Sequence, residues 1–236
     1  MTPDLDLQSL RLADFDTDGA VRETCDAMER HTRSGFLRGT FGATVAALGT
    51  VAVWPTAAAA AARASTDVAI LNFALALEYL QASFYTEAER IGALHGALKQ
   101  QADVVGAHER AHVKAFGQLL GAKAIKEPRF NFHGVTESQD AFRRTAVAFE
   151  DLAVAAYKGQ APLITSRSYL AGAIGIHSVE ARHAAWIRRL AGFLPAAKAF
   201  DDPLDAHRVV DIVNATHFVT LQDPHTSSGT SPHFTG

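Results

Sequence analysis

Cysteine is almost absent from this chain, and the position of the only one is informative. The 236 residues contain one cysteine, Cys25, so no disulfide can form within the chain. From residue 26 onward there is no thiol that could bind a metal or act as a nucleophile. Any chemistry in that part of the chain therefore depends on carboxylates and imidazoles.

The chain also lacks a strong charge of either sign. Its net charge is −3 and its pI is about 6.4, so nothing favours nucleic acid as a partner. Aromatic residues make up only 8% of the sequence, and no long segment alternates strictly between apolar and polar residues. Both features disfavour β-strands, while the abundant alanine favours close-packed helices. We therefore expect an all-α protein.

One segment near the N-terminus, residues 39–62, has no charged residue at all. Arg33 and Arg38 precede it, and the small-x-small sequence Ala62-Arg63-Ala64 follows it. A basic flank, an apolar core and a small-residue cleavage site are the layout of an export signal. The segment before the core resembles a twin-arginine signal, with Ser34 in place of the second arginine.

These features predict an acidic leader and a signal peptide at 1–64, and an exported protein that is periplasmic or extracellular. Two alternatives remain: an uncleaved membrane anchor at 39–62, since 24 residues can cross a bilayer, and a buried helix. The Ala, Gly and Thr content makes the segment a poor membrane span. We expect one domain at 65–220 and a disordered polar tail at 221–236.

Two segments about 72 residues apart repeat one pattern of ionisable residues. In each, a Glu is followed by a Tyr seven residues later and, 31 or 30 residues after the first Glu, by a Glu-x-x-His sequence. The copies are Glu78, Tyr85, Glu109, His112 and Glu150, Tyr157, Glu180, His183. A doubled Glu and Glu-x-x-His pattern is the one by which a four-helix bundle binds two metal ions.

The spacing also predicts where four helices turn. The midpoint of the first Glu pair is 93.5, between Gly92 and Gly96, and that of the second is 165. We expect Gly121 to end the second helix, and the third to begin near Thr136 and to kink at 159–162. Short links within each pair and one long crossover between the pairs favour a ferritin-like antiparallel four-helix bundle.

Charge counting supports two metal ions in such a bundle. Glu78 and Glu150 lie among apolar residues, where an unpaired carboxylate is very costly. Two divalent cations would balance four carboxylates and two neutral imidazoles. This oxygen-rich set suits iron or manganese better than structural zinc. The predicted metal ligands are Glu78, Glu109, His112, Glu150, Glu180 and His183.

Four further side chains lie near the predicted ligands in the sequence. Tyr85 and Tyr157 lie two turns from the leading Glu residues, so they are either core tyrosines or groups that support the metal ligands. His177 lies one turn before Glu180 and is a candidate for an extra ligand or proton carrier. His108 points about 100° away from Glu109 and is expected at the surface.

Four segments that carry these residues resemble the ferritin-like family that includes desiccation-related proteins. They are Asn72–Tyr85, His108–His112, Phe149–Gly159 and Val179–Ala185, and the resemblance extends over about 67–215. It implies a di-iron or di-manganese carboxylate site, often in exported stress-associated proteins.

The function that follows is redox chemistry on dioxygen or hydrogen peroxide, ferroxidase-like or catalase-like. The alternative is a non-catalytic metal-binding or structural bundle that protects during desiccation or metal stress. A homo-oligomer, including a hollow iron-storage shell, is compatible with either.

Overall fold

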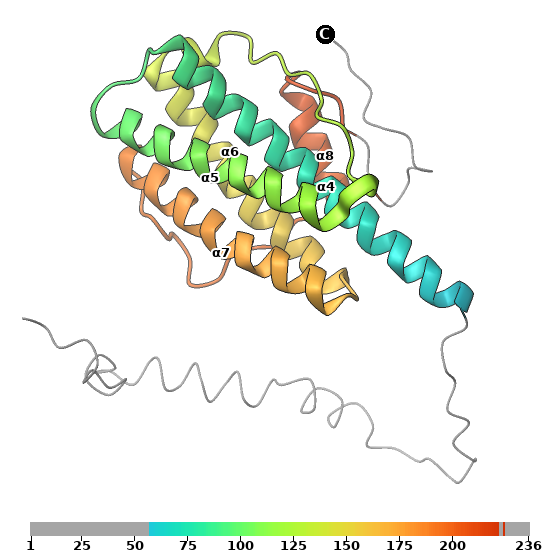
Figure 1. The fold of residues 1–236 in the computed structure, drawn as a ribbon. Coiled ribbons are helices and arrows are strands. Elements are labelled where there is room, and N and C mark those ends of the chain that lie inside the picture. Colours follow the sequence, from blue (N-terminus) through green and yellow to red (C-terminus); the bar gives the residue numbers. More distant parts are fainter. Residues whose placement is uncertain (1–56, 222–223, 225–236) are drawn as a thin grey trace, which may run out of the picture. The chain divides into compact units, whose positions relative to one another are not determined.

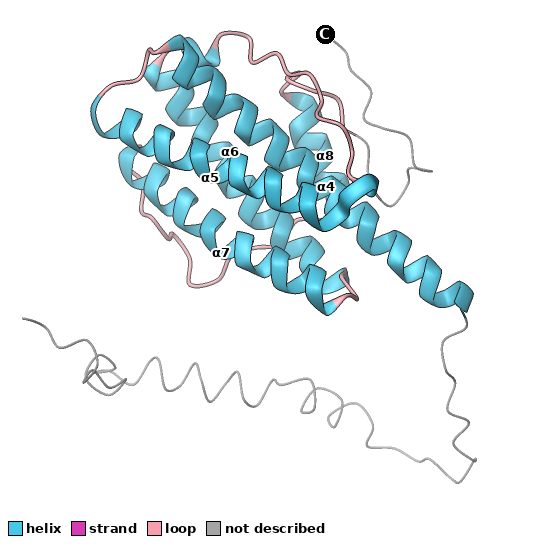
Figure 2. Cartoon of the chain, viewed as in Figure 1, coloured by secondary structure: helices cyan, strands magenta, loops and turns pink. Residues whose placement is uncertain are grey.

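The fold comes from a computed structural model, which describes residues 57–221 and residue 224. Side chains are described from Ala64 onward. The predicted leader, most of the uncharged segment and nearly all of the predicted tail lie outside these residues. Within them the chain forms helices and loops without strands (Figure 2), which confirms the all-α prediction.

Four long helices form an antiparallel bundle (Figure 1). They are α4 (Ala57–Ile91), α5 (Gly96–Leu120), α6 (Gln139–Gln160) and α7 (Arg167–Leu190). The α4–α5 and α6–α7 pairs pack most closely, and α5–α7 and α4–α6 contacts join the two pairs. Each pair is closed by a short link, and the long crossover between α5 and α6 includes two short 3-10 turns. The predicted topology is confirmed.

Two predicted helix boundaries are wrong. Thr136 does not cap α6, since it lies in the 3-10 turn Val135–Glu137 and its hydroxyl donates to Glu87. Ser138 takes that place and accepts a hydrogen bond from the backbone N–H of Ala141. At the other end α6 stops at Gln160 instead of kinking. The next turn contains Pro162, which has no N–H with which to continue the helix.

The start of α7 is tied to α4 by one buried carboxylate. Ser166 caps α7, and the side chain of Asp67 accepts hydrogen bonds from the backbone N–H groups of Thr165 and Ser166, both at 2.8 Å. Asp67 is only 2% exposed, whereas residues 64–66 before it are exposed. Among the described side chains, those packed in the bundle therefore begin at Asp67.

Helix α4 is also the one helix of the described part that is long and apolar enough to cross a membrane. The segment is Ala64–Ile91, and 67% of its most apolar stretch is buried inside the bundle. Length and composition alone do not distinguish a membrane span from a core helix. Its burial against the other helices explains the apolar character of this segment.

A fifth helix, α8 (Ala206–Ala215), packs against α6, and a glycine makes the approach possible. Leu204, just before α8, donates its N–H to the carbonyl of Ala155 at 3.0 Å. A Cβ on Gly159 would lie 1.8 Å from the carbonyl oxygen of Leu204. The glycine that we expected to break the helix therefore lies inside it, where another backbone segment crosses. Leu221, predicted in the tail, is buried and bonded to Asn214.

This contact predicts a large loss of stability in the variant Gly159→Ala. The methyl group meets backbone rather than a movable side chain, so α8 must shift and the protein should lose about 3 kcal/mol of unfolding free energy. The matched control is Gly175→Ala on α7, where a Cβ meets nothing within 4 Å. It should stabilise by up to about 1 kcal/mol. Urea unfolding of both variants measures the difference, and equal midpoints would contradict the prediction.

Candidate metal centre

The repeated pattern of the sequence converges on one place inside the bundle. Each helix supplies part of it: Glu78 from α4, Glu109 and His112 from α5, Glu150 from α6, and Glu180 and His183 from α7. In each Glu-x-x-His sequence the two side chains share a face because residues three apart are neighbours on a helix. The four carboxylates are at most 1% exposed and His183 is 3% exposed. The bundle thus buries four acids around two imidazoles.

Each imidazole turns its Nδ1 atom toward three of these carboxylates. Around His112 the distances are 3.0 Å to Glu180, 3.1 Å to Glu78 and 3.6 Å to Glu109. Around His183 they are 2.9 Å to Glu109, 3.5 Å to Glu150 and 3.8 Å to Glu180. Glu109 and Glu180 therefore face both imidazoles, while Glu78 and Glu150 each face one.

Several of these atoms are close but do not form hydrogen bonds. Glu109 Oε1 and His183 Nδ1 lie 2.9 Å apart, yet neither has a hydrogen-bond partner among the described residues. Both side-chain oxygens of Glu180 are also buried without such a partner. Adjacent ligands of one ion lie about 3 Å apart when each is about 2.1 Å from it. The close, misaligned atoms are what ligands that face a common ion would show.

The ligand atoms fall into two overlapping groups, each of which could hold a metal ion. One group contains Glu78, Glu109, His112 and Glu180, and the other Glu109, Glu150, Glu180 and His183. Within each group the ligand atoms lie within 4.8 Å of one another. Glu109 and Glu180 belong to both groups. The structure thus brings together all six predicted ligands, whose role in binding stays a prediction.

The two tyrosines contact this cluster crosswise. The hydroxyl of Tyr85 on α4 donates to Glu150 on α6 at 2.6 Å, and that of Tyr157 on α6 donates to Glu78 on α4. Both rings are buried. Burial and the neighbouring carboxylate raise the pKa of each tyrosine, so both hydroxyls stay protonated and keep donating. The tyrosines are therefore core residues. Their hydroxyls also hold one oxygen of Glu150 and one of Glu78.

The protonation of the cluster shows that it is short of positive charge. Burial and the charges of Glu180 and Glu109 raise the pKa of Glu78 well above its usual value, and burial raises that of Glu150 to about 8. Burial lowers the pKa of each imidazole, but the surrounding carboxylates raise it to about 12 for His112 and about 11 for His183. Burial would also raise the pKa of Glu109, but its contacts with both imidazoles lower it to about 2. Protons here take the place that cations would fill, so metal binding should release them.

Two other histidines differ in their relation to the cluster. His108 is exposed as a residue, as expected, but its Nδ1 lies 2.9 Å from Nε2 of His183. This contact was not predicted, because a 100° turn away from Glu109 points toward α7 rather than only to solvent. His177 contacts the ring of Tyr157, with ring centroids 6.4 Å apart, and belongs to neither ligand group. It is placed beside the cluster, not in it.

The part of the chain that carries these residues was compared with known families. The model for a ferritin-like domain matches residues 66–192, more than half of the chain. The chain belongs to the ferritin-like family. This ferritin-like domain also aligns with the crystal structure of a conserved hypothetical protein from Mycobacterium tuberculosis. The TM-score is 0.48 and the identity 19%, over 58% of this chain and 99% of that one. A search of curated proteins gave no match.

Proposed function

We propose that this ferritin-like protein binds two iron or manganese ions and carries out redox chemistry on dioxygen or hydrogen peroxide. The observation that carries the proposal is the pair of overlapping ligand groups that share Glu109 and Glu180. A shared pair of carboxylates suits two ions that lie close together, as in the carboxylate-bridged centres of four-helix bundles. Six oxygen and nitrogen ligands without sulfur favour iron or manganese.

Each of the six residues would have a defined role in such a centre. Glu109 and Glu180 would bridge the ions, and His112 and His183 would each bind one ion through Nδ1. Glu78 and Glu150 would complete the two sites, held in place by the hydroxyls of Tyr157 and Tyr85. The burial of the carboxylates excludes bulk water. When bound, the ions would supply the change of oxidation state that reduction of dioxygen or peroxide requires.

We also propose that the protein is exported and acts in stress protection. The support for export is the uncharged segment 39–62 with its basic flank and small-residue cleavage site. Cleavage after Ala64 would remove the first eight residues of α4, 57–64, and leave Asp67 and the buried side chains after it in place. The intact mass of protein recovered from its native compartment tests this, since an uncut chain would keep the mass of all 236 residues.

Metal analysis together with oxygen and peroxide consumption tests the redox proposal. We expect about two equivalents of iron or manganese per chain and turnover that a chelator abolishes. Two bound ions without consumption of either oxidant would instead favour the non-catalytic metal-binding bundle. If Fe(II) or Mn(II) neither binds nor changes the melting temperature, the metal site itself is wrong. Light scattering adds the oligomeric state, because iron storage requires a closed shell.

A further inference from the structure

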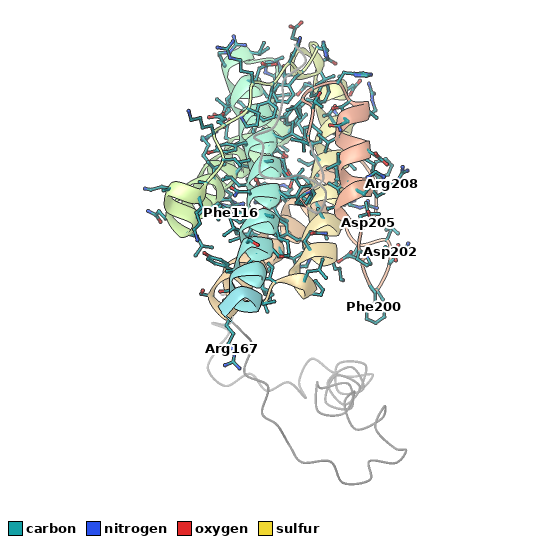
Figure 3. The ribbon with its side chains drawn as sticks, turned by 90° about the vertical axis from the view of Figure 1, so that its right-hand side faces the viewer. Phe116, Arg167, Phe200, Asp202, Asp205 and Arg208 are labelled. Atoms are coloured by element: carbon teal, nitrogen blue, oxygen red, sulfur yellow. The ribbon has the colours of Figure 1, made fainter. Side chains whose placement is uncertain are left out.

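A pocket opens beside the metal centre, at the end of the bundle where α7 begins. Its lining comes from all four helices and the turn after α6, and includes Ile70, Ala74, Leu77, Phe116, Ala156 and Tyr157. Apart from Tyr157 and Gln160, every lining side chain is apolar. Figure 3 labels Phe116, which reaches this region from α5 and is 2% exposed. The metal centre therefore has an apolar pocket on one side.

The side chain of Tyr157 connects this pocket to the predicted ligands. Tyr157 lines the pocket, and its hydroxyl donates to Glu78. Leu77, which also lines the pocket, is the residue before Glu78 on α4. A molecule in the pocket would thus lie against the ring of Tyr157, next to the Glu78 side of the centre.

The two halves of the internal repeat carry different side chains around this pocket and at the matching positions. Shifting the pocket residues by 72 gives the matching positions at the Tyr85 side, and three of these carry an aromatic ring where the pocket has a smaller side chain. Phe142 replaces Ile70, Phe149 replaces Leu77, and Phe84 stands where the second half has Ala156. The rings of Phe84 and Phe142 stack with centroids 4.8 Å apart, and Phe84 also contacts the rings of Tyr85 and Phe149. Aromatic rings pack together at the Tyr85 side, whereas the pocket lies at the Tyr157 side.

The size and polarity of the pocket define what it can accept. Its cavity volume is about 20 Å³, and one water-sized molecule needs about 10–15 Å³ on that measure. Apolar lining disfavours ordered water and favours small apolar molecules, as in apolar cavities that bind xenon. We propose that the pocket binds dioxygen and passes it to the Tyr157 side of the centre. This inference rests on the proposed function.

Xenon tests the pocket without any metal or turnover, because it is an apolar atom of similar size. The full chain with labelled Ile and Leu methyl groups is studied by NMR under xenon pressure. We expect xenon to shift the methyl signals of Ile70, Leu71 and Leu77, and to leave those of Ile187 and Leu94 unchanged. Unchanged signals from all three pocket residues would overturn the proposal.

Filling the pocket tests its role in oxygen supply. Ala74 lines the pocket on α4, and Ala69 on the same helix is equally half-buried but does not line it. In Ala74→Leu we expect the xenon shifts to disappear and the KM for dioxygen to rise about tenfold, with kcat little changed. Ala69→Leu should behave as the wild type, and Ala156→Phe, which copies Phe84, provides a second filled variant.

The two proposals fail in different ways. An active protein with the same dependence on oxygen concentration in wild type, Ala74→Leu and Ala156→Phe would overturn the oxygen pocket alone. A metal-loaded protein that consumes neither oxidant would overturn the proposed function, and with it the assignment of dioxygen to the pocket. Xenon shifts that survive in both filled variants would also overturn the pocket, since they would place xenon elsewhere.

Discussion

Replacing Glu109 with alanine is expected to abolish metal binding and, with it, any turnover of dioxygen or peroxide. Glu109 is the carboxylate nearest to His183, at 2.9 Å, and lies 3.6 Å from His112, so its loss removes a ligand from both groups at once. Loss of a residue that only supports a ligand weakens metal affinity 10- to 100-fold, and loss of a shared ligand should cost about 100-fold or more. Metal analysis after gel filtration measures the result.

A comparison with Glu150→Ala makes this prediction sharper. Glu150 belongs to one ligand group, so that variant should keep about one equivalent where Glu109→Ala keeps none. Glu137→Ala, which changes an exposed carboxylate in the crossover, should bind as the wild type. Far-UV circular dichroism verifies that each variant is folded. If Glu109→Ala retained two ions, the bridging position assigned to Glu109 would be wrong.

The clustering of these six side chains was predictable because much of its geometry is local to each helix. Three-residue spacing places Glu109 with His112 and Glu180 with His183, whatever else the bundle does. The midpoints of the Glu pairs then place the partners at the same height, and the structure has its turns there, at 92–95 and 161–166. Repeats and periodicity carry this information because they depend on the helix itself. The same reasoning explains why the family topology was predictable.

The contacts that the sequence did not indicate lie between helices that no short turn joins. Spacing places Tyr85 below Glu78 on the same helix, but its hydroxyl crosses to Glu150 because α4 packs on α6. The contact of His108 with His183 is missed for the same reason, as it depends on how α5 lies against α7. Nothing in one sequence fixes the relative height of helices that the chain does not connect directly.

The predicted helix boundaries were wrong where two candidate end residues lie close together in the sequence. Thr136 and Ser138 are both suitable N-cap residues, and the choice between them is made by Glu87, which binds the hydroxyl of Thr136 from α4. Gly159 was interpreted as a helix breaker because glycine lowers helix propensity. Its position is instead explained by Leu204, a residue 45 positions later whose carbonyl crosses there.

The second large effect concerns stability, and its sign depends on metal. Replacing Glu150 with glutamine should stabilise the metal-free protein. Burial raises the pKa of Glu150 to about 8, so at pH 7 the fold must keep a proton that the unfolded chain gives up. A shift from about 4.5 to about 8 costs about 3 kcal/mol at pH 7. In Glu150→Gln the side chain is neutral at all pH values, and its oxygen can still accept from Tyr85.

The pH dependence follows from the same pKa. Because the folded protein binds the extra proton, wild-type stability should fall as pH rises from about 4.5 to about 8, and this part of the fall should be absent in Glu150→Gln. The two proteins should therefore be nearly equal near pH 4, differ by about 3 kcal/mol at pH 7 and differ by up to about 5 kcal/mol above pH 8. Urea unfolding in the presence of a chelator measures this, with Glu137→Gln as the exposed control.

Adding metal should reverse the order of the two proteins. A ligand that binds only the folded state stabilises it by about 4.1 kcal/mol at 1,000 times its dissociation constant, so one ion more than offsets the deficit of about 3 kcal/mol at pH 7. The wild type should gain this with Mn(II) or Fe(II), while Glu150→Gln should lose the contribution of at least one ion.

A carboxylate that served only a structural hydrogen-bond network would give the opposite pattern. Glu150→Gln would then be no more stable than the wild type in chelator, and neither stability would depend on metal. The crossing of the two stabilities thus separates a site built for cations from a buried polar network, because only the former keeps acids in the core at a cost to the metal-free fold.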